Sequence, residues 1–161
     1  MAWTTPITFV AGNPLTAAQL NAIQANLNAL KAPPASLFNG LAAYSSVNVS
    51  STSFVELDAT NLSPSITMAG GRMLVLFHCN LSPTGSGDDF YINMKLDGGD
   101  VGISSIGFGG ITVNTGKTLA YDVSFATAAL AAGAHGLRVY GRVGGGNTIA
   151  FQNAYIFVQE I

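Results

Sequence analysis

Charged side chains are scarce in this sequence. Only 9% of its 161 residues are Asp, Glu, Lys or Arg, against roughly 25% in an average domain. Hydrophobic residues make up 48%, so the chain can bury a core and is not a disordered segment. Its surface must therefore be built largely from Ser, Thr, Asn, Gly and Ala. A surface with so few ions is easier to bury against a partner or another copy of the chain.

The sequence also lacks an excess of basic residues, and its net charge is −2. This balance argues against binding to nucleic acid and against binding to an anionic membrane surface. No apolar run is long enough for membrane insertion. The N-terminus has neither the basic region nor the apolar core of a signal peptide. We therefore expect a protein made in a cytoplasm that reaches any extracellular role by another route.

Cysteine and histidine are almost absent. Cys79 is the single cysteine, which excludes an intrachain disulfide, and its apolar neighbours predict a buried, inert thiol. His78 and His135 are the two histidines, and neither has a carboxylate at metal-ligand spacing. We predict no metal and no cofactor. His135 lies in a tight AAGAHG segment, where a turn or interface residue is expected.

No catalytic arrangement stands out. Asp88 with Asp89, and Asp97 with Asp100, are acidic pairs in loops, where polar turn chemistry is favoured over a calcium site. Segment 110–118 ends like a phosphate-binding loop, but five residues rather than four separate its glycines and a strand pattern follows. Without a nucleophile–base pair or paired acids, the sequence predicts that the protein is not an enzyme.

One short helix is predicted, within residues 12–31. Thr16 is a good N-cap, and Gln19 three residues later completes a capping box. Pro33 and Pro34 end the helix. A helix this short is marginal in water by itself and must pack against something.

An apolar stripe runs along this helix at spacings of three, four and three residues, the a/d pattern of a coiled coil. Its members are Leu20, Ile23, Leu27 and Leu30. Leu at a with Ile at d favours trimers or tetramers over dimers. The stripe could equally pack on the chain's own β-domain, and both interpretations stay open from the sequence.

The helix belongs to an N-terminal arm, residues 1–34, that precedes a β-domain, residues 35–161. Lys31 carries the first charged side chain and Glu56 the next, so the arm can enter a protein groove without desolvating ions. Its extended first twelve residues carry apolar anchors that either pack on the β-domain of the same chain or dock into another protein: Trp3, Pro6, Ile7 and Phe9. Residues 32–40 are expected to form a polyproline-like linker.

Short alternating segments with Gly-rich turns predict an antiparallel β-sandwich or jelly roll. The predicted strands are 44–49, 53–57, 61–68, 72–81, 90–96, 101–106, 119–125, 136–143, 148–152 and 154–161. Run 72–81 is nearly continuous in apolar residues, which fits a strand buried on both faces or one between the core and a subunit interface. Residues 90–96 alternate, with Tyr91, Asn93 and Lys95 outward. The Ala-rich segment 128–134 is expected to form a short helical turn.

A row of side chains is predicted to point outward from strand 136–143. Arg138, Tyr140 and Arg142 recur at every second position. They form either a ligand surface or a subunit interface, and the interface is favoured because Arg and Tyr are common in interface hot spots.

Both ends of the chain resemble known proteins. Residues 3–30, with W-T-T-P, F-V-A-G and L-T-A-A-Q-L-N, resemble the opening of tailed-bacteriophage structural proteins. Residues 133–161, with A-G-A-H-G-L-R-V-Y-G-R and N-A-Y-I-F-V-Q-E-I, are similar to the closing strands of phage fibre and decoration domains. The resemblance implies a tumour-necrosis-factor-like jelly roll that forms a homotrimer on the virion surface. A fibre, minor tail or capsid decoration protein would attach to capsid or tail proteins through its arm.

The alternative function is a carbohydrate-binding module for a host receptor, since jelly rolls often serve that role. Tyr91, Tyr140 and Tyr155 are the candidate aromatic platforms, with Asp88 and Asp89 as hydroxyl or calcium ligands. Fold alone does not decide between a structural and a glycan-binding role.

Overall fold

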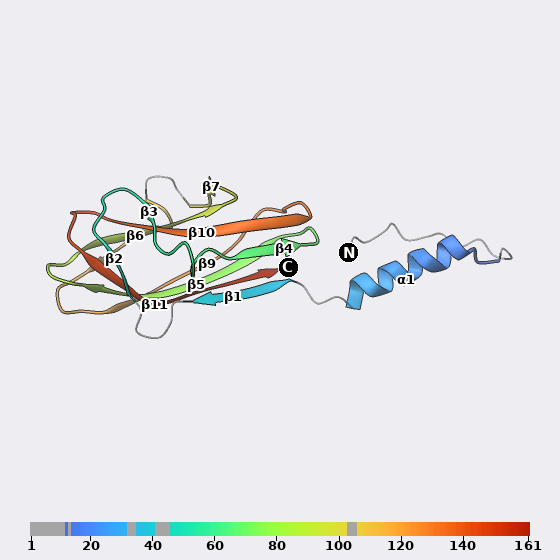
Figure 1. Ribbon diagram of the computed structural model, residues 1–161, viewed down its shortest axis with the longest axis horizontal. Helices are drawn as coiled ribbons and strands as arrows, with labels where there is room; N and C mark the ends of the chain where they lie inside the picture. Colours follow the sequence, from blue (N-terminus) through green and yellow to red (C-terminus); the bar gives the residue numbers. More distant parts are fainter. Residues whose placement is uncertain (1–11, 13, 32–34, 41–45, 103–105) are drawn as a thin grey trace.

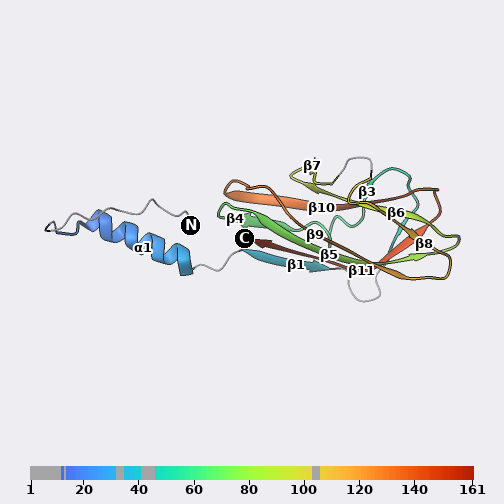
Figure 2. The same ribbon diagram turned by 180° about the vertical axis from the view of Figure 1, so that it is seen from behind.

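The computed structural model describes residues 12, 14–31, 35–40, 46–102 and 106–161. It is mainly β, with one helix that lies beyond one end of a two-layered sandwich (Figures 1 and 2). The elements are α1 (Ala17–Lys31), β1 (Ser36–Gly40), β2 (Ser46–Val49), β3 (Val55–Glu56), β4 (Ser65–Met68), β5 (Met73–Pro83), β6 (Asp88–Leu96), β7 (Gly99–Asp100), β8 (Gly110–Val113), β9 (Leu119–Ala126), β10 (Gly133–Val143) and β11 (Ile149–Glu160).

Every strand pairing is antiparallel. The first sheet has the order β1-β11-β5-β9, with β2 also paired to β11. The second has the order β3-β10-β6-β7, with β4 beside β10 and β8 beside β6. The long strands β5, β6, β9, β10 and β11 alternate between the two sheets, so the connections cross from one layer to the other. This is the antiparallel jelly-roll sandwich that the sequence predicted.

The core fills the space between the two sheets. Along β5, every second residue from Met73 to Leu81 is buried, as expected for a strand with one face on the core. Three buried aromatic rings join the two layers. The centroid of the Phe151 ring lies 5.9 Å from that of Phe77 in the same sheet and 6.3 Å from that of Phe90 in the other sheet. The outward face of β5 stays open in the single chain, and Leu76 is 41% exposed. The strand is therefore not buried on both faces by its own chain.

The helix begins as the sequence predicted. The Gln19 backbone N–H donates to Thr16 Oγ1 at 3.3 Å, and the Thr16 N–H donates to Gln19 Oε1 at 2.9 Å. These two bonds are the reciprocal capping box. Among the described residues, no helix combines the length and the apolar character needed to cross a membrane.

Two expected boundaries differ in the structure. The polyproline-like linker was expected to reach residue 40, but Ser36–Gly40 form β1 and pair with β11 over residues 155–159. The linker prediction was wrong there because the free edge of β11 offers backbone partners that the local sequence does not reveal. The two closing strands are one strand, β11, whose register shifts between Gln152 and Tyr155. Asn153, at φ 48°, forms the irregularity.

Three further expectations were wrong, each because a long-range contact overrides local pattern. Segment 128–134 forms no helical turn, since Leu130 bridges to Gly71. The described part of 101–106 is not a strand, because Val101 and Gly102 bend toward β6. The predicted outward residue Asn93 is buried. Its amide donates to Asp100 at 2.9 Å and accepts from the Gly102 N–H at 3.2 Å, so this bend covers it.

Candidate functional site

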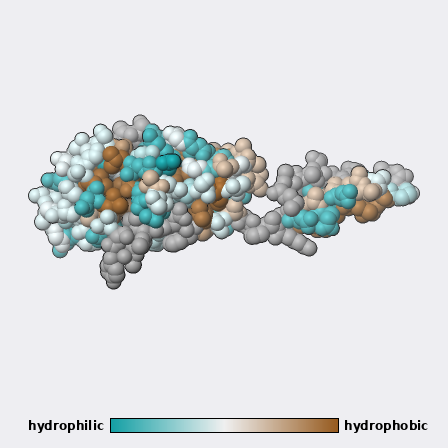
Figure 3. Space-filling model, in the orientation of Figure 1, coloured by the Kyte–Doolittle hydropathy of each residue, from teal (hydrophilic) through white to brown (hydrophobic). Residues whose placement is uncertain are grey.

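Within the described residues, the apolar stripe of α1 does not pack on the sandwich. The helix lies to one side of the β-domain (Figure 1), and its visible face carries both hydrophilic and hydrophobic surface (Figure 3). Leu20 is 51% exposed and Leu27 is 46% exposed, while Ile23 is half-buried. Leu30 belongs to the helix, but its side chain lies outside the described residues. Of the two interpretations of the stripe, the structure does not show packing on the chain's own domain.

The predicted particle anchors lie outside the described residues. These are Trp3, Pro6, Ile7 and Phe9, and their role stays a prediction.

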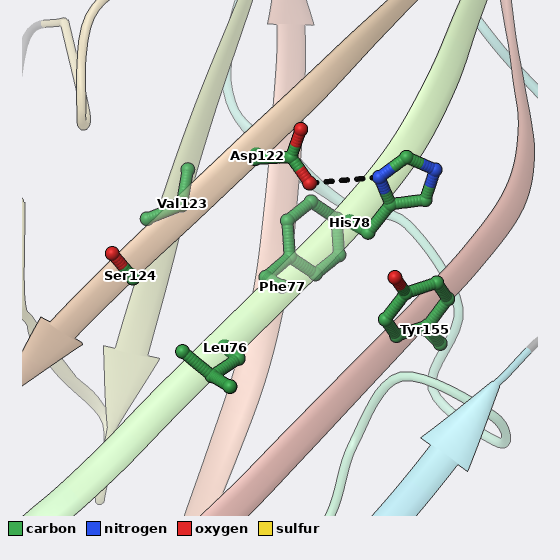
Figure 4. Close-up of a pocket in the computed structure, with 7 residues that line it drawn as sticks. All are labelled: Leu76, Phe77, His78, Asp122, Val123, Ser124 and Tyr155. Carbon is green, nitrogen blue, oxygen red and sulfur yellow. Dashed lines mark hydrogen bonds and ion pairs between the residues drawn. The ribbon is translucent and has the colours of Figure 1, made fainter.

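A shallow depression of about 280 Å³ lies on the outer face of the first sheet (Figure 4). We name this surface the Tyr155 face; its residues are Leu76, Phe77, His78, Asp122, Val123, Ser124 and Tyr155. Asp122, His78 and Tyr155 are direct neighbours on β9, β5 and β11. His78 Nδ1 lies 2.8 Å from Asp122 Oδ1, and the His78 ring stacks on Tyr155.

The Tyr155 face has little charge and exposes apolar area. Leu76 is 41% exposed and Tyr155 is 40% exposed. None of the five strands of this sheet contains a Lys or Arg. Its depression holds one acidic side chain, Asp122, which already faces His78. Such a surface suits burial against protein, because few ions would have to be desolvated.

The outer face of the second sheet differs from the Tyr155 face because it carries cationic side chains. Arg138, Tyr140 and Arg142 lie in one row on β10, as the alternation predicted, and β6 adds Tyr91 and Lys95 beside them. We name these five residues the Tyr140 face. All the Lys and Arg residues that lie in strands are found here. The sequence had placed Tyr91 and Lys95 outward, but their position beside the β10 row depends on the register between two distant strands.

The cations of the Tyr140 face lie against aromatic rings or an acid. The Arg142 guanidinium lies 3.8 Å from the Tyr91 ring centroid and 5.4 Å from that of Phe54. Lys95 Nζ lies 4.9 Å from the Tyr140 centroid. These are cation–π distances. Arg138 Nη1 donates to both carboxylate oxygens of Glu56, at 3.0 and 3.1 Å.

His135 has a structural position in the fold. Its Nδ1 lies 2.7 Å from Asp97 Oδ2 and its Nε2 lies 2.9 Å from the Ala131 carbonyl oxygen. The hydrogen bond to Asp97, followed by that to Ala131, raises the pKa of His135 above its usual value. The same bond from His135, with the Gly136 N–H, lowers the pKa of Asp97. The pair ties the turn after β6 to the start of β10.

The acidic loop pairs serve turns. Asp88 accepts hydrogen bonds from the backbone N–H groups of Gly145 and Asn147. Desolvation opposes the ionisation of Asp88, but its backbone hydrogen bonds outweigh that effect and lower its pKa. Asp100 accepts from Asn93 and Asp97 from Gly136. Within the described residues, no group of three His, Cys, Asp or Glu side chains could hold a metal ion.

Cys79 is fully buried on the inward face of β5. Burial, with a smaller contribution from the Asp122 charge, raises the pKa of its thiol far above the usual range. This confirms the predicted buried thiol.

Comparison of the sequence with protein-family models and with curated proteins finds no match. Comparison of the structure with solved structures finds matches of low identity. They include Eiger TNF from S. frugiperda, at 12% identity and a TM-score of 0.47 over 81% of this chain and 94% of that one. They also include the EclA C-terminal domain, described as a sugar-binding protein, at 14% identity and a TM-score of 0.41 over 72% of this chain and 79% of that one.

A third match is dimeric latent PorU from Porphyromonas gingivalis, at 11% identity and a TM-score of 0.42 over 80% of this chain. The match spans only 13% of the PorU chain. At these identities and TM-scores, no statement about binding or activity follows from the matches. By its own strand pairings, the described part of the chain is an antiparallel jelly-roll sandwich preceded by one short helix.

Proposed function

We propose that this chain is a structural protein of a bacteriophage virion, a homotrimeric surface appendage of the fibre, minor tail or capsid-decoration kind. The observation that carries the proposal is the exposed stripe of α1. A helix of 15 residues is marginal in water without a packing partner, and α1 presents Leu20 and Leu27 to solvent rather than to its own sandwich. A bundle of three copies would cover that stripe.

The chain's path supports the same arrangement. Four residues separate Lys31 of α1 from Ser36 of β1, a connection that spans at most about 18 Å. β1 is an edge strand of the first sheet. A helix bundle would therefore hold the first sheet of every copy near the common axis, and the outer surface of that sheet is the Tyr155 face. Its apolar, cation-free character suits contact between copies.

The attachment role rests on the N-terminal arm. The arm has no charged side chain before Lys31, so docking it in a groove of a capsid or tail protein would desolvate no side-chain ion. Its resemblance to the opening of tailed-phage structural proteins supports a virion as the particle. The sandwich would then be the exposed part.

The test is the solution mass of a double variant and of a matched control, measured by light scattering. Leu20→Asp with Leu27→Asp places two carboxylates on the stripe and should reduce the trimer to smaller species. Asn21→Asp with Asn28→Asp adds the same charge at the same seven-residue spacing, on exposed positions outside the stripe, and should leave the mass unchanged. An unchanged mass in the first variant, or an equal loss in both, would overturn the role of the helix.

A further inference from the structure

We propose that the Tyr140 face is a binding site for a polysaccharide that carries carboxylate groups. The site lies within one chain and goes beyond the structural role proposed above. It joins three side chains with polar groups directed outward, Lys95, Arg138 and Tyr140, on the paired strands β6 and β10.

The first argument is an uncompensated cation. Arg138 lies directly opposite Lys95 in the β10–β6 register, and like charges at directly opposed positions destabilise a sheet. Glu56 compensates Arg138 alone. Asp100 is the residue opposite Lys95 on β7, but its carboxylate binds the amide of buried Asn93 and forms no ion pair with Lys95. Among the described residues, Lys95 has no acidic partner, and an incoming carboxylate would supply one.

The second argument is the set of donors that remain. Arg138 is 54% exposed and uses Nη1 for Glu56, so other N–H groups of its planar fork are left for a carboxylate. The hydroxyl of Tyr140 has no hydrogen-bond partner within the described part of the chain and is free to bind a sugar hydroxyl. The Lys95 ammonium lies over the Tyr140 ring, so the positive charge of Lys95 and the hydroxyl of Tyr140 are close enough to contact the same sugar residue.

The third argument is the contrast between the two outer faces. The sheet that carries the Tyr155 face has no Lys or Arg in its strands, whereas β6 and β10 hold three. β6 also holds Asp88 and Asp89 at its other end, where Asp88 accepts hydrogen bonds from the backbone N–H groups of Gly145 and Asn147. The three cations found in strands thus all lie on the sheet that faces away from the proposed contact between copies. Three such sites on one trimer would bind a repeating polymer with avidity, although each site alone is weak.

The experiment uses the full chain and two soluble polymers of matched length, hyaluronan with its carboxylates and neutral dextran. Binding is measured by calorimetry at low and at physiological salt. We expect binding to hyaluronan that weakens with salt, and no binding to dextran. Lys95→Gln and Arg138→Gln should each weaken binding about tenfold, and Tyr140→Phe should weaken it less, because only the hydroxyl is lost.

The matched control is Lys117→Gln, which removes one positive charge from an exposed residue between β8 and β9. Hyaluronan binding by this variant should stay within about twofold of the wild type. An equal loss in Lys117→Gln and Lys95→Gln, equal binding of dextran, or no hyaluronan binding at low salt would each overturn the site. Thermal unfolding confirms that each variant is folded. Light scattering on the same samples reports the trimer separately, so failure of one proposal is distinguishable from failure of the other.

Discussion

The ring of Tyr155 stacks on the imidazole of His78 across β11 and β5, with 5.0 Å between the ring centroids and 25° between their planes. Asp122 on β9 lies on the other side of His78 (Figure 4). This row spans three strands and lies on the outer face of the first sheet beside exposed Leu76. His78 Nδ1 and Asp122 Oδ1 already contact each other at 2.8 Å within the chain, so this contact could be kept when the face is buried between copies.

A charge placed on the Tyr155 face should weaken assembly. Leu76→Asp would bury a carboxylate between copies, and we expect the dissociation constant of the trimer to rise at least about tenfold. Val55→Asp is the matched control, because Val55 is 40% exposed but lies on β3 of the other sheet. Sedimentation equilibrium measures the dissociation constant of the trimer for each variant. If the two variants dissociate equally, the Tyr155 face is not the contact.

Stability should depend on pH through His135 and Asp97. The pKa of His135 is raised above 6.5, so its contribution is complete below that pH and is lost as pH rises through the higher folded value. The pKa of Asp97 is lowered from 3.8, so its contribution is present above that pH and is lost on acidification through the lower folded value. The pair therefore stabilises the fold most between pH 3.8 and pH 6.5, the ordinary pKa values of the two groups.

The measurement is the melting temperature of the wild type and of His135→Gln across this range. The difference between the two proteins should be largest between pH 3.8 and pH 6.5 and should shrink as the pH rises above 6.5 through the higher folded pKa of His135. A difference that does not change with pH would show that His135 acts through packing alone.

The thiol of Cys79 should be unreactive in the folded protein. It is fully buried and its pKa is raised by burial, so the nucleophilic thiolate is scarce. A chromogenic disulfide reagent should titrate no thiol per chain in buffer and one per chain in denaturant. Rapid labelling in buffer would contradict the buried position.

The core should depend strongly on Phe151, whose ring contacts Phe77 and Phe90 and so joins the two sheets. Phe151→Ala should lower the free energy of unfolding by about 3–5 kcal/mol. Ile161→Ala, at a side chain that is 59% exposed, should change it by less than about 0.5 kcal/mol. Denaturant unfolding followed by fluorescence compares them, and similar midpoints for both variants would be inconsistent with this packing.

The features that the sequence predicted well depend on near neighbours in the chain. The capping box of Thr16 and Gln19 closes over three residues, and alternation along β10 places Arg138, Tyr140 and Arg142 in one row. These patterns follow from helix and strand geometry alone. The antiparallel sandwich follows from the number and spacing of such segments.

The features that were missed depend on register between distant strands. Nothing local to Ser36–Gly40 shows that β11 will pair with it, and nothing near Asn93 shows that the bend at Gly102 will cover it. The same holds for the candidate surfaces. The Tyr155 face requires Asp122, His78 and Tyr155 to meet across three strands. The alternation of residues along a strand predicts which side of the sheet each side chain lies on. Only the register between paired strands determines which side chains become neighbours.

The solution mass of the full chain, measured by light scattering across a dilution series, tests the central claim most directly. The exposed stripe of α1 and the cation-free Tyr155 face predict a species of three times the 16.5 kDa chain, stable on dilution to the micromolar range. A mass of 16.5 kDa at every concentration would contradict self-association, and with it the proposal that this protein is a trimeric appendage.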